Sequence, residues 1–97
     1  MAEYVLLVNW TEQGIVNVTE SPKRLDAGKA LAAKLGCKIT KFYMTFGAYD
    51  QICLIEAPND DTLAKYVLTL SQAGNIRVTT LKAFSETSYR EIIGALN

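Results

Sequence analysis

The fold is decided by residues 38–57, KITKFYMTFGAYDQICLIEA, which have the pattern of two strands joined by a tight turn. Residues 38–46 alternate polar and apolar side chains, as an edge strand does, whereas residues 49–57 have an apolar centre. Gly47 is the first residue of a two-residue connection, where a type II′ hairpin turn prefers glycine. This stretch therefore predicts an antiparallel hairpin. The expected facing pairs are Thr45 with Asp50, Tyr43 with Ile52, and Phe42 with Cys53.

The flanking segments predict further strands and helices. Residues 4–10, YVLLVNW, are apolar on both faces, which is typical of a central strand. Ser21 as N-cap and Pro22 at the first helical position mark the start of a helix, and Gly36 marks its end. The remaining elements are a helix capped by Asn59 or Asp60 and ending at Gly74, a strand at 76–84, and a helix from a cap at Ser85 to Leu96.

The order β-α-β-β-α-β followed by a helix is the split βαβ, ferredoxin-like arrangement of α+β proteins. Two right-handed crossovers then place the strands in the spatial order 4-1-3-2. The two strands expected at the centre carry the runs VLLV and ICLI, whereas the two edge strands carry lysines and threonines. Length and pattern together predict one domain over residues 1–97.

Apolar side chains on both faces of the central strands predict self-association. Both crossover helices cover one face of such a sheet, and the other face would expose a patch that soluble monomers seldom tolerate. Val5 and Leu7 point to that second face. A second copy packed sheet to sheet would cover it, and we expect a homodimer or a larger homo-oligomer. The alternative is that the C-terminal helix folds back over the same face.

Composition excludes several classes of function. Lys plus Arg equals Asp plus Glu, ten each, so the chain lacks the cationic excess on which nucleic-acid binding rests. No signal peptide and no run of about 20 apolar residues is present, so we expect a cytoplasmic protein without a membrane partner. The chain has no histidine and two cysteines, which removes the usual zinc sites and the Ser-His and Cys-His pairs. Neither a metal nor another cofactor is expected.

The two cysteines are not expected to form a disulfide. In the predicted register Cys53 faces Phe42, so Cys37 lies five residues further along its strand. At about 3.3 Å per residue this is about 16 Å, well beyond the limit of about 7 Å between the Cα atoms of a disulfide.

The hairpin is the first candidate site. Aspartate is unfavourable in strands, so Asp50 beside the turn needs a reason. Its carboxylate would anchor or deprotonate a ligand, and Asp50 and Tyr43 are the acid/base candidates. In the structural alternative, which we favour because isolated carboxylates seldom specify chemistry, Asp50 accepts hydrogen bonds from the backbone or from Thr45. The candidate ligand-binding residues here are Tyr43, Thr45, Tyr49 and Asp50.

The second candidate site is expected at the opposite end of the sheet. The end of the first strand and the start of the last strand bring together Asn9, Arg77 and Thr79. Ser21 and Arg24 would lie nearby, and arginine beside a helix N-terminus favours an anion or carboxylate. The structural alternative, which we favour because structural arginines are common, is an interface or capping salt bridge. Trp10 and Tyr66 are expected to be core or interface residues.

The hairpin motif Gly47-Ala48-Tyr49-Asp50, followed by an apolar strand and Glu56-Ala57-Pro58, resembles the signature of the GYD domain family. The segments NWTEQGI (9–15), SPKR (21–24), GNIR (74–77) and TLKAFS (80–85) agree with it. The resemblance implies a prokaryotic stand-alone domain related to the dimeric α/β barrel proteins. That wider group includes monooxygenases, isomerases, dehydratases, haem proteins and ligand-sensing domains.

Two classes of function fit these observations. The first is a dimeric α/β barrel that binds a small organic or anionic ligand, and that could be a cofactor-independent enzyme with Asp50 and Tyr43 as acid/base groups and Arg77 as anion anchor. The second is a non-enzymatic accessory, sensory or assembly-forming module. Haem chemistry is a weaker third option, because without histidine only Tyr, Cys or Met could be the axial ligand. The sequence leaves open whether the protein is an enzyme.

Overall fold

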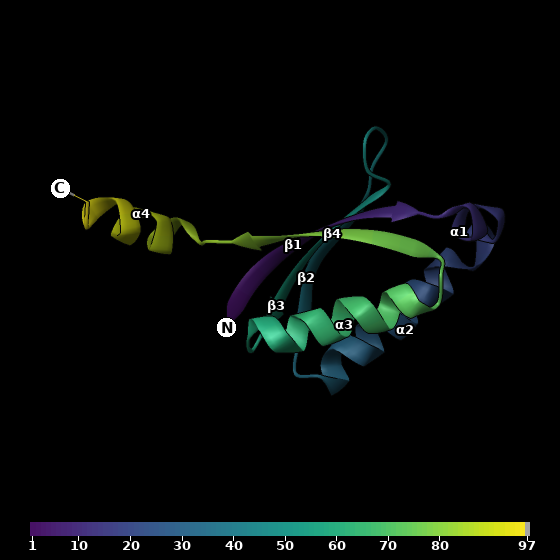
Figure 1. Cartoon of the computed structure of the whole chain (residues 1–97), viewed down its shortest axis with the longest axis horizontal. Coiled ribbons are helices and arrows are strands. Elements are labelled where there is room, and N and C mark those ends of the chain that lie inside the picture. Colours follow the sequence, from purple (N-terminus) through teal and green to yellow (C-terminus); the bar gives the residue numbers. More distant parts are fainter. Residues whose placement is uncertain (97) are drawn as a thin grey trace.

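The computed structural model describes residues 1–96, which form a four-stranded antiparallel sheet with two long helices on one face (Figure 1). The strands are β1 (Ala2–Trp10), β2 (Lys38–Met44), β3 (Gln51–Ala57) and β4 (Ile76–Ala83). The helices are α1 (Glu12–Val16), the 3₁₀ turn η1 (Val18–Glu20), α2 (Ser21–Lys34), α3 (Asp60–Gln72) and α4 (Glu86–Gly94). The spatial order β2-β3-β1-β4 is the predicted order read from the other edge, so the predicted α+β class and ferredoxin-like strand order are confirmed.

The core lies between the sheet and helices α2 and α3. The even-numbered side chains of β1 and the odd-numbered side chains of β3 point toward the helices, because Leu6 is paired with Cys53 and Tyr4 with Ile55. At the centre Tyr66 of α3 is 2% exposed, and its hydroxyl donates to the carbonyl of Gly28 in α2 at 3.0 Å. The buried core residues are Tyr4, Leu6, Val8, Ala32, Cys37, Cys53, Ile55, Ala57, Leu63 and Tyr66.

Most predicted helix ends are confirmed. The Asn59 side chain accepts a hydrogen bond from the Thr62 N–H at 2.8 Å, and Ser85 caps α4 in the same way. Gly36 and Gly74 adopt the left-handed conformation, with φ of 76° and 83°, that ends a helix. The N-cap prediction for Ser21 is wrong. Because η1 runs directly into α2, Ser21 has helical angles, and the cap position falls on Glu20 without a side-chain hydrogen bond.

The hairpin differs from the prediction at its turn. The pairs Tyr43 with Ile52 and Phe42 with Cys53 are present, but β2 ends at Met44 and β3 begins at Gln51, so residues 45–50 form a loop. The Thr45 N–H still donates to the Asp50 carbonyl at 2.8 Å. The Asp50 N–H, however, donates to the carbonyl of Val8 in β1 at 2.9 Å. This bond directs Asp50 toward β1 and goes with a wider turn.

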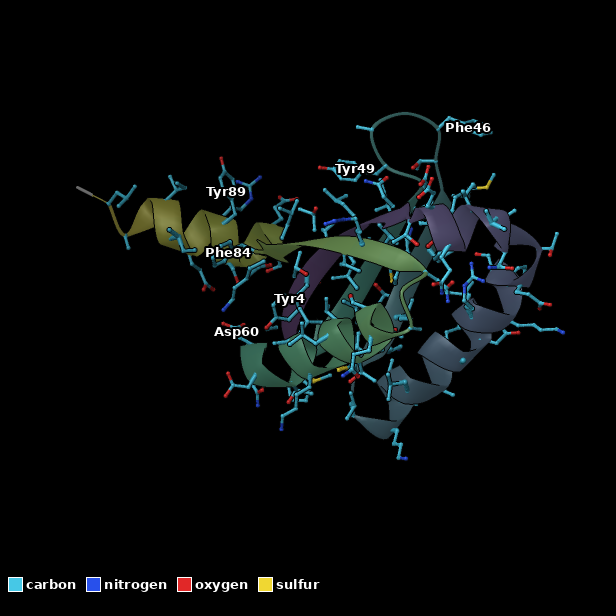
Figure 2. The ribbon with its side chains drawn as sticks, turned by 45° about the vertical axis from the view of Figure 1, so that its right-hand side comes forward. Tyr4, Phe46, Tyr49, Asp60, Phe84 and Tyr89 are labelled. Atoms are coloured by element: carbon cyan, nitrogen blue, oxygen red, sulfur yellow. The ribbon has the colours of Figure 1, made fainter. Side chains whose placement is uncertain are left out.

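No element within residues 1–96 covers the face of the sheet opposite to the core. Two rows of facing residues cross it, and most of their members are apolar. We call this surface the open face, formed by Val5, Leu7, Tyr43, Ile52, Leu54 and Leu81. The alternative in which the C-terminal helix folds back over this face is wrong, because α4 extends away from the sheet (Figure 1). Figure 2 shows Phe84 and Tyr89 on this projecting segment, which has no buried residue.

Candidate functional site

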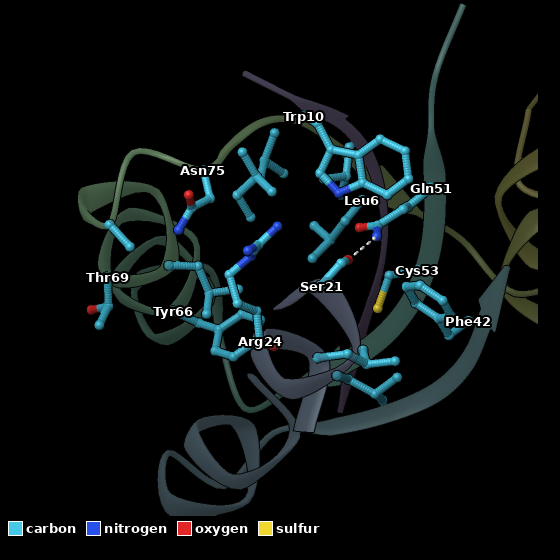
Figure 3. Close-up of a pocket in the computed structure, with 17 residues that line it drawn as sticks. Leu6, Trp10, Ser21, Arg24, Phe42, Gln51, Cys53, Tyr66, Thr69 and Asn75 are labelled. Carbon is cyan, nitrogen blue, oxygen red and sulfur yellow. Dashed lines mark hydrogen bonds between the residues drawn. The ribbon is translucent and has the colours of Figure 1, made fainter. Parts of the chain in front are cut away.

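A pocket of about 220 Å³ opens on the helix side of the sheet, between β1, β3, α2 and α3 (Figure 3). Its walls are mainly apolar, as the walls of small-molecule sites usually are. The apolar lining residues are Leu6, Val8, Trp10, Leu25, Ile39, Phe42, Cys53, Tyr66, Leu70, Ala73, Ile76 and Val78. The polar lining residues are Ser21, Arg24, Gln51, Thr69 and Asn75.

Trp10, the last residue of β1, contributes a hydrogen-bond donor that has no acceptor. Its indole Nε1 is the one buried side-chain nitrogen or oxygen among residues 1–96 without a hydrogen-bond partner. Such a group costs about 1–3 kcal/mol relative to a satisfied one, so most buried polar groups are paired. In Figure 3 this nitrogen points into the pocket. A bound molecule that brings an acceptor atom to this nitrogen would satisfy it.

Arg24, on the first turns of α2, provides the only charge in the pocket lining. Its Nη1 donates to the carbonyl of Asn17 at 3.0 Å and its Nη2 to that of Gly14 at 3.4 Å, which fixes the side chain against η1 and α1. Among the described residues it takes part in no ion pair. Since a guanidinium has five N–H donors, two bonds to carbonyls leave others for a ligand. The guanidinium points toward the middle of the pocket in Figure 3.

Hydrogen bonds hold the rim of the pocket. The Gln51 amide donates to the Ser21 hydroxyl at 3.4 Å, which joins β3 to the start of α2 (Figure 3). On the other side the Asn75 carbonyl accepts from the Thr11 N–H at 3.0 Å, and its side chain accepts from Gln13 at 3.0 Å. Both polar rims are thus held by bonds between elements that are distant in sequence.

The titratable groups inside the pocket are neutral near pH 7, apart from the guanidinium of Arg24. Burial raises the pKa of the Cys53 thiol to about 11, and the thiolate is the reactive form of cysteine. Burial also raises the pKa of Tyr66, whose hydroxyl already donates to Gly28. Neither side chain is therefore a base or nucleophile at neutral pH, and the lining is suited to binding.

The two predicted candidate sites lie at the same end of the sheet, so the prediction of opposite ends is wrong. Because β1 is antiparallel to β3, the end of β1 meets the start of β3, and Val8 is paired with Gln51. Asn9 faces Arg77 across β1 and β4. These residues belong to the face opposite to the helices, together with Thr79 and Tyr43, whereas Ser21 and Arg24 line the pocket on the helix side.

Asp50 holds the end of β1. One of its carboxylate oxygens accepts a hydrogen bond from the backbone N–H of Trp10 at 3.0 Å, which matches the structural alternative for this residue. Thr45 donates through its hydroxyl to the Tyr49 carbonyl at 2.6 Å, within the loop. Asp50 thus positions the backbone of the residue whose indole lines the pocket.

A second polar cluster lies at the other end of β1. The Tyr4 hydroxyl donates to Asp60, which raises the pKa of Tyr4 to about 12, and Figure 2 shows the two side chains together. This hydrogen bond, together with Lys82 at 3.2 Å, lowers the pKa of Asp60. The cluster joins α3 to β1 and β4.

No metal-binding cluster occurs within the part of the chain that the structure describes: no three His, Cys, Asp or Glu residues are grouped so that they could hold an ion. Cys37 and Cys53 are both free, which confirms that they form no disulfide. Among residues 1–96, no helix combines the length and the apolar character needed to cross a bilayer.

The chain belongs to the GYD domain family, whose sequence model matches residues 4–93, and the predicted resemblance is confirmed. Among individual proteins, it is similar to the glutamine synthetase and cystathionine beta-lyase binding protein of Thermus thermophilus, with 26% identity over 84 residues. That match covers 86% of this chain and 88% of the relative.

Two crystal structures have the same fold. MtbAldR superposes with a TM-score of 0.67 at 15% identity, over 88% of this chain but 52% of its own, so the chain spans about half of that protein. TTHA0845 from Thermus thermophilus superposes with a TM-score of 0.55 at 21% identity, over 88% of this chain and 95% of its own. At these identities the similarity is one of fold.

Proposed function

We propose that this protein is a small ligand-binding domain that binds a small organic molecule in the pocket between its sheet and its helices. The observation that carries the proposal is the unpaired indole N–H of Trp10, buried in an apolar pocket that also contains Arg24. A few convergent polar groups in an apolar cavity are the usual mark of a small-molecule site.

The size and chemistry of the pocket favour binding over catalysis. Its volume of about 220 Å³ lies below the range of roughly 300–1,000 Å³ typical of drug-sized ligands, so the ligand is small. Asp50 and Tyr43, the acid/base candidates, do not line this pocket: the Asp50 carboxylate accepts from the backbone N–H of Trp10, and Tyr43 belongs to the open face.

Ligand binding can be tested with the chain's single tryptophan as the reporter, since Trp10 lines the pocket. The protein is titrated with a library of small organic acids, amides, alcohols and amines while Trp10 fluorescence is recorded. Native mass spectrometry of gently purified protein is run in parallel. We expect a saturable fluorescence change or a reproducible extra mass. A library without any saturable change, together with a protein-only mass, would exclude the proposal.

The proposed assembly is a homodimer, or a larger homo-oligomer, that buries the open face by packing sheet against sheet. Six mainly apolar side chains form that face, and no element of the described residues 1–96 covers it. A symmetric pair would close the two sheets into a dimeric α/β barrel, because each copy offers the same surface.

Sedimentation of Leu7→Lys tests the assembly, since Leu7 lies at the centre of the open face. We expect the wild type to sediment as a dimer or larger species and the variant to dissociate. The matched control is Leu68→Lys on α3, a leucine that is already 65% exposed. If the wild type sediments as a monomer, the proposed dimer is excluded. If both variants dissociate equally, the interface does not lie on the open face.

A second candidate function is that of an accessory protein that binds enzymes. It is favoured by the Thermus relative, which is named for its binding of glutamine synthetase and cystathionine beta-lyase. The projecting segment around α4 carries exposed apolar residues that suit a protein partner, among them Phe84, Tyr89 and Ile93. Co-elution with the purified Thermus enzymes would support this function for this chain, and separate elution would exclude those partners.

A further inference from the structure

We infer that the ligand of this pocket is a small monocarboxylate with an apolar body, held by the guanidinium of Arg24 and the indole N–H of Trp10. The inference rests on the proposed ligand-binding function and specifies its ligand class.

The charge of the ligand follows from the pocket lining. Of the 17 lining residues Arg24 alone is charged, and no Asp, Glu or Lys is among them. The Arg24 side chain is half-buried, and its hydrogen-bond partners, the carbonyls of Gly14 and Asn17, supply only partial charges, so no formal charge in the lining offsets the guanidinium. One negative charge on the ligand therefore neutralises the pocket.

Two other anionic classes fit less well. A phosphate dianion would bring two negative charges to one guanidinium and leave one of them uncompensated in an apolar cavity. An α-amino acid would bring an ammonium group, which prefers a carboxylate partner, and the lining contains none. The single charge of Arg24 is matched by a single carboxylate.

The two donors offer one partner for each oxygen of a carboxylate. Arg24 and Trp10 come from α2 and β1, on different walls, and in Figure 3 the nitrogens of both side chains point into the space between them. One carboxylate oxygen accepts from the guanidinium, and the other accepts from the indole N–H that is otherwise unpaired. The hydroxyl of Ser21 and the amide of Gln51 lie on the same rim.

The rest of the pocket defines the body of the ligand. Behind the polar groups the lining is hydrocarbon, aromatic and thiol, and Cys53 and Tyr66 are neutral there. A polyhydroxylated body such as a sugar would leave its hydroxyl groups without partners, at about 1–3 kcal/mol each. An aliphatic or aromatic body instead gains from the removal of its apolar surface from water.

The test compares acids with amides of the same shape. Isothermal titration calorimetry is carried out with hexanoate and benzoate, and with hexanamide and benzamide as neutral isosteres. We expect at least one acid to bind ten times or more tightly than its amide. Arg24→Gln should reduce the affinity for the acid by ten-fold or more and that for the amide by a much smaller factor, because a neutral amide carbonyl loses a hydrogen bond but no ion pair. Trp10→Phe, which keeps an aromatic ring and removes the N–H, should reduce it several-fold.

The matched control is Lys23→Gln, which removes a positive charge from the adjacent position of α2, where Lys23 pairs with Glu20 and does not line the pocket. Thermal melts confirm that each variant is folded. Equal affinity for acid and amide, or an equal loss in Arg24→Gln and Lys23→Gln, overturns the carboxylate assignment and leaves the pocket as a site for another ligand. If neither series binds and the wider library also fails, the proposed function itself fails.

Discussion

Replacement of Gly14 by alanine should destabilise the protein strongly, although the residue lies in a short helix where alanine is favoured. A Cβ atom at this position would lie 1.9 Å from the carbonyl oxygen of Asn75, where contacts below 3.0 Å are essentially never observed. One backbone must therefore move by at least 1.1 Å (3.0 − 1.9). The move separates α1 from the loop that joins α3 to β4.

The size of the effect follows from the bonds that this movement breaks. The Thr11 N–H donates to the Asn75 carbonyl at 3.0 Å, and the Thr11 hydroxyl donates to the Gly74 carbonyl at 2.5 Å. Two such bonds are worth about 1–3 kcal/mol together, and overpacking strain adds about 1–3 kcal/mol. The higher helix propensity of alanine offsets about 1 kcal/mol of this loss in stability. We expect a net loss of about 3 kcal/mol, or a fall in Tm of roughly 12–24 °C for a domain of this size.

The assay is urea and thermal unfolding followed by circular dichroism, with Gly28→Ala as the matched control. Gly28 is also a helical glycine, but its added Cβ would meet the Tyr66 hydroxyl at 3.4 Å, an ordinary contact, so we expect a change below about 1 kcal/mol. A Gly14→Ala protein that melts within about 2 °C of the wild type would refute the close-approach argument. Equal losses in the two variants would show that the effect is not specific to this contact.

Three further predictions concern hydrogen bonds that join distant elements. Tyr66→Phe removes the donor to Gly28 and should cost about 1 kcal/mol, measured by urea unfolding; an unchanged midpoint would contradict it. Asp50→Ala should cost about 1–3 kcal/mol of stability because the Trp10 N–H loses its acceptor, whereas Asp50→Asn keeps an acceptor oxygen and should cost less. Equal melting temperatures of the two variants would show that loss of this hydrogen bond does not cause the destabilisation. Asp60→Asn should lower Tm near neutral pH. The pKa of Asp60 is lowered in the fold, so the stabilisation by its carboxylate is present above the unfolded pKa of about 3.9 and is lost as the pH falls through the folded-state pKa. The difference in Tm between Asp60→Asn and the wild type should therefore disappear in acid. A difference that stays constant with pH would contradict the role of the Asp60 carboxylate.

Strand order could be predicted from the sequence because burial leaves a direct trace in composition. The VLLV and ICLI runs identify two strands that are apolar on both faces, and these are the central strands β1 and β3. Helix ends could also be predicted, because the cap formed by Asn59 and the left-handed conformations of Gly36 and Gly74 depend only on residues close to them in sequence. The width of the hairpin turn could not be predicted in this way, because it depends on a residue distant in sequence. Gly47 fits a two-residue turn, but the bond from Asp50 to Val8, in a strand distant in sequence, draws the chain into a longer loop.

The candidate site was harder to predict, because it depends on which face each residue occupies. The alternation along β1 assigns Trp10 to the helix side, with Leu6 and Val8, and Asn9 to the side of the sheet opposite to the helices. That pattern could have placed Arg77, which faces Asn9, on the other side of the sheet from Trp10, and could have marked Trp10 as a candidate site residue on the helix side. The pocket itself could not be predicted, since it results from how α2 and α3 are placed on the sheet, and no local pattern encodes an empty volume.

The projecting helix α4 has a thermodynamic consequence. It is nine residues long, none of them is buried, and an isolated helix shorter than about 12–15 residues is marginal in water. Its helical state should therefore be coupled to contact with another molecule, and its backbone amides should exchange with deuterated solvent rapidly in a free monomer and slowly in an assembly. The amides of Ile92 and Ile93 would then measure the association constant as the protein is diluted.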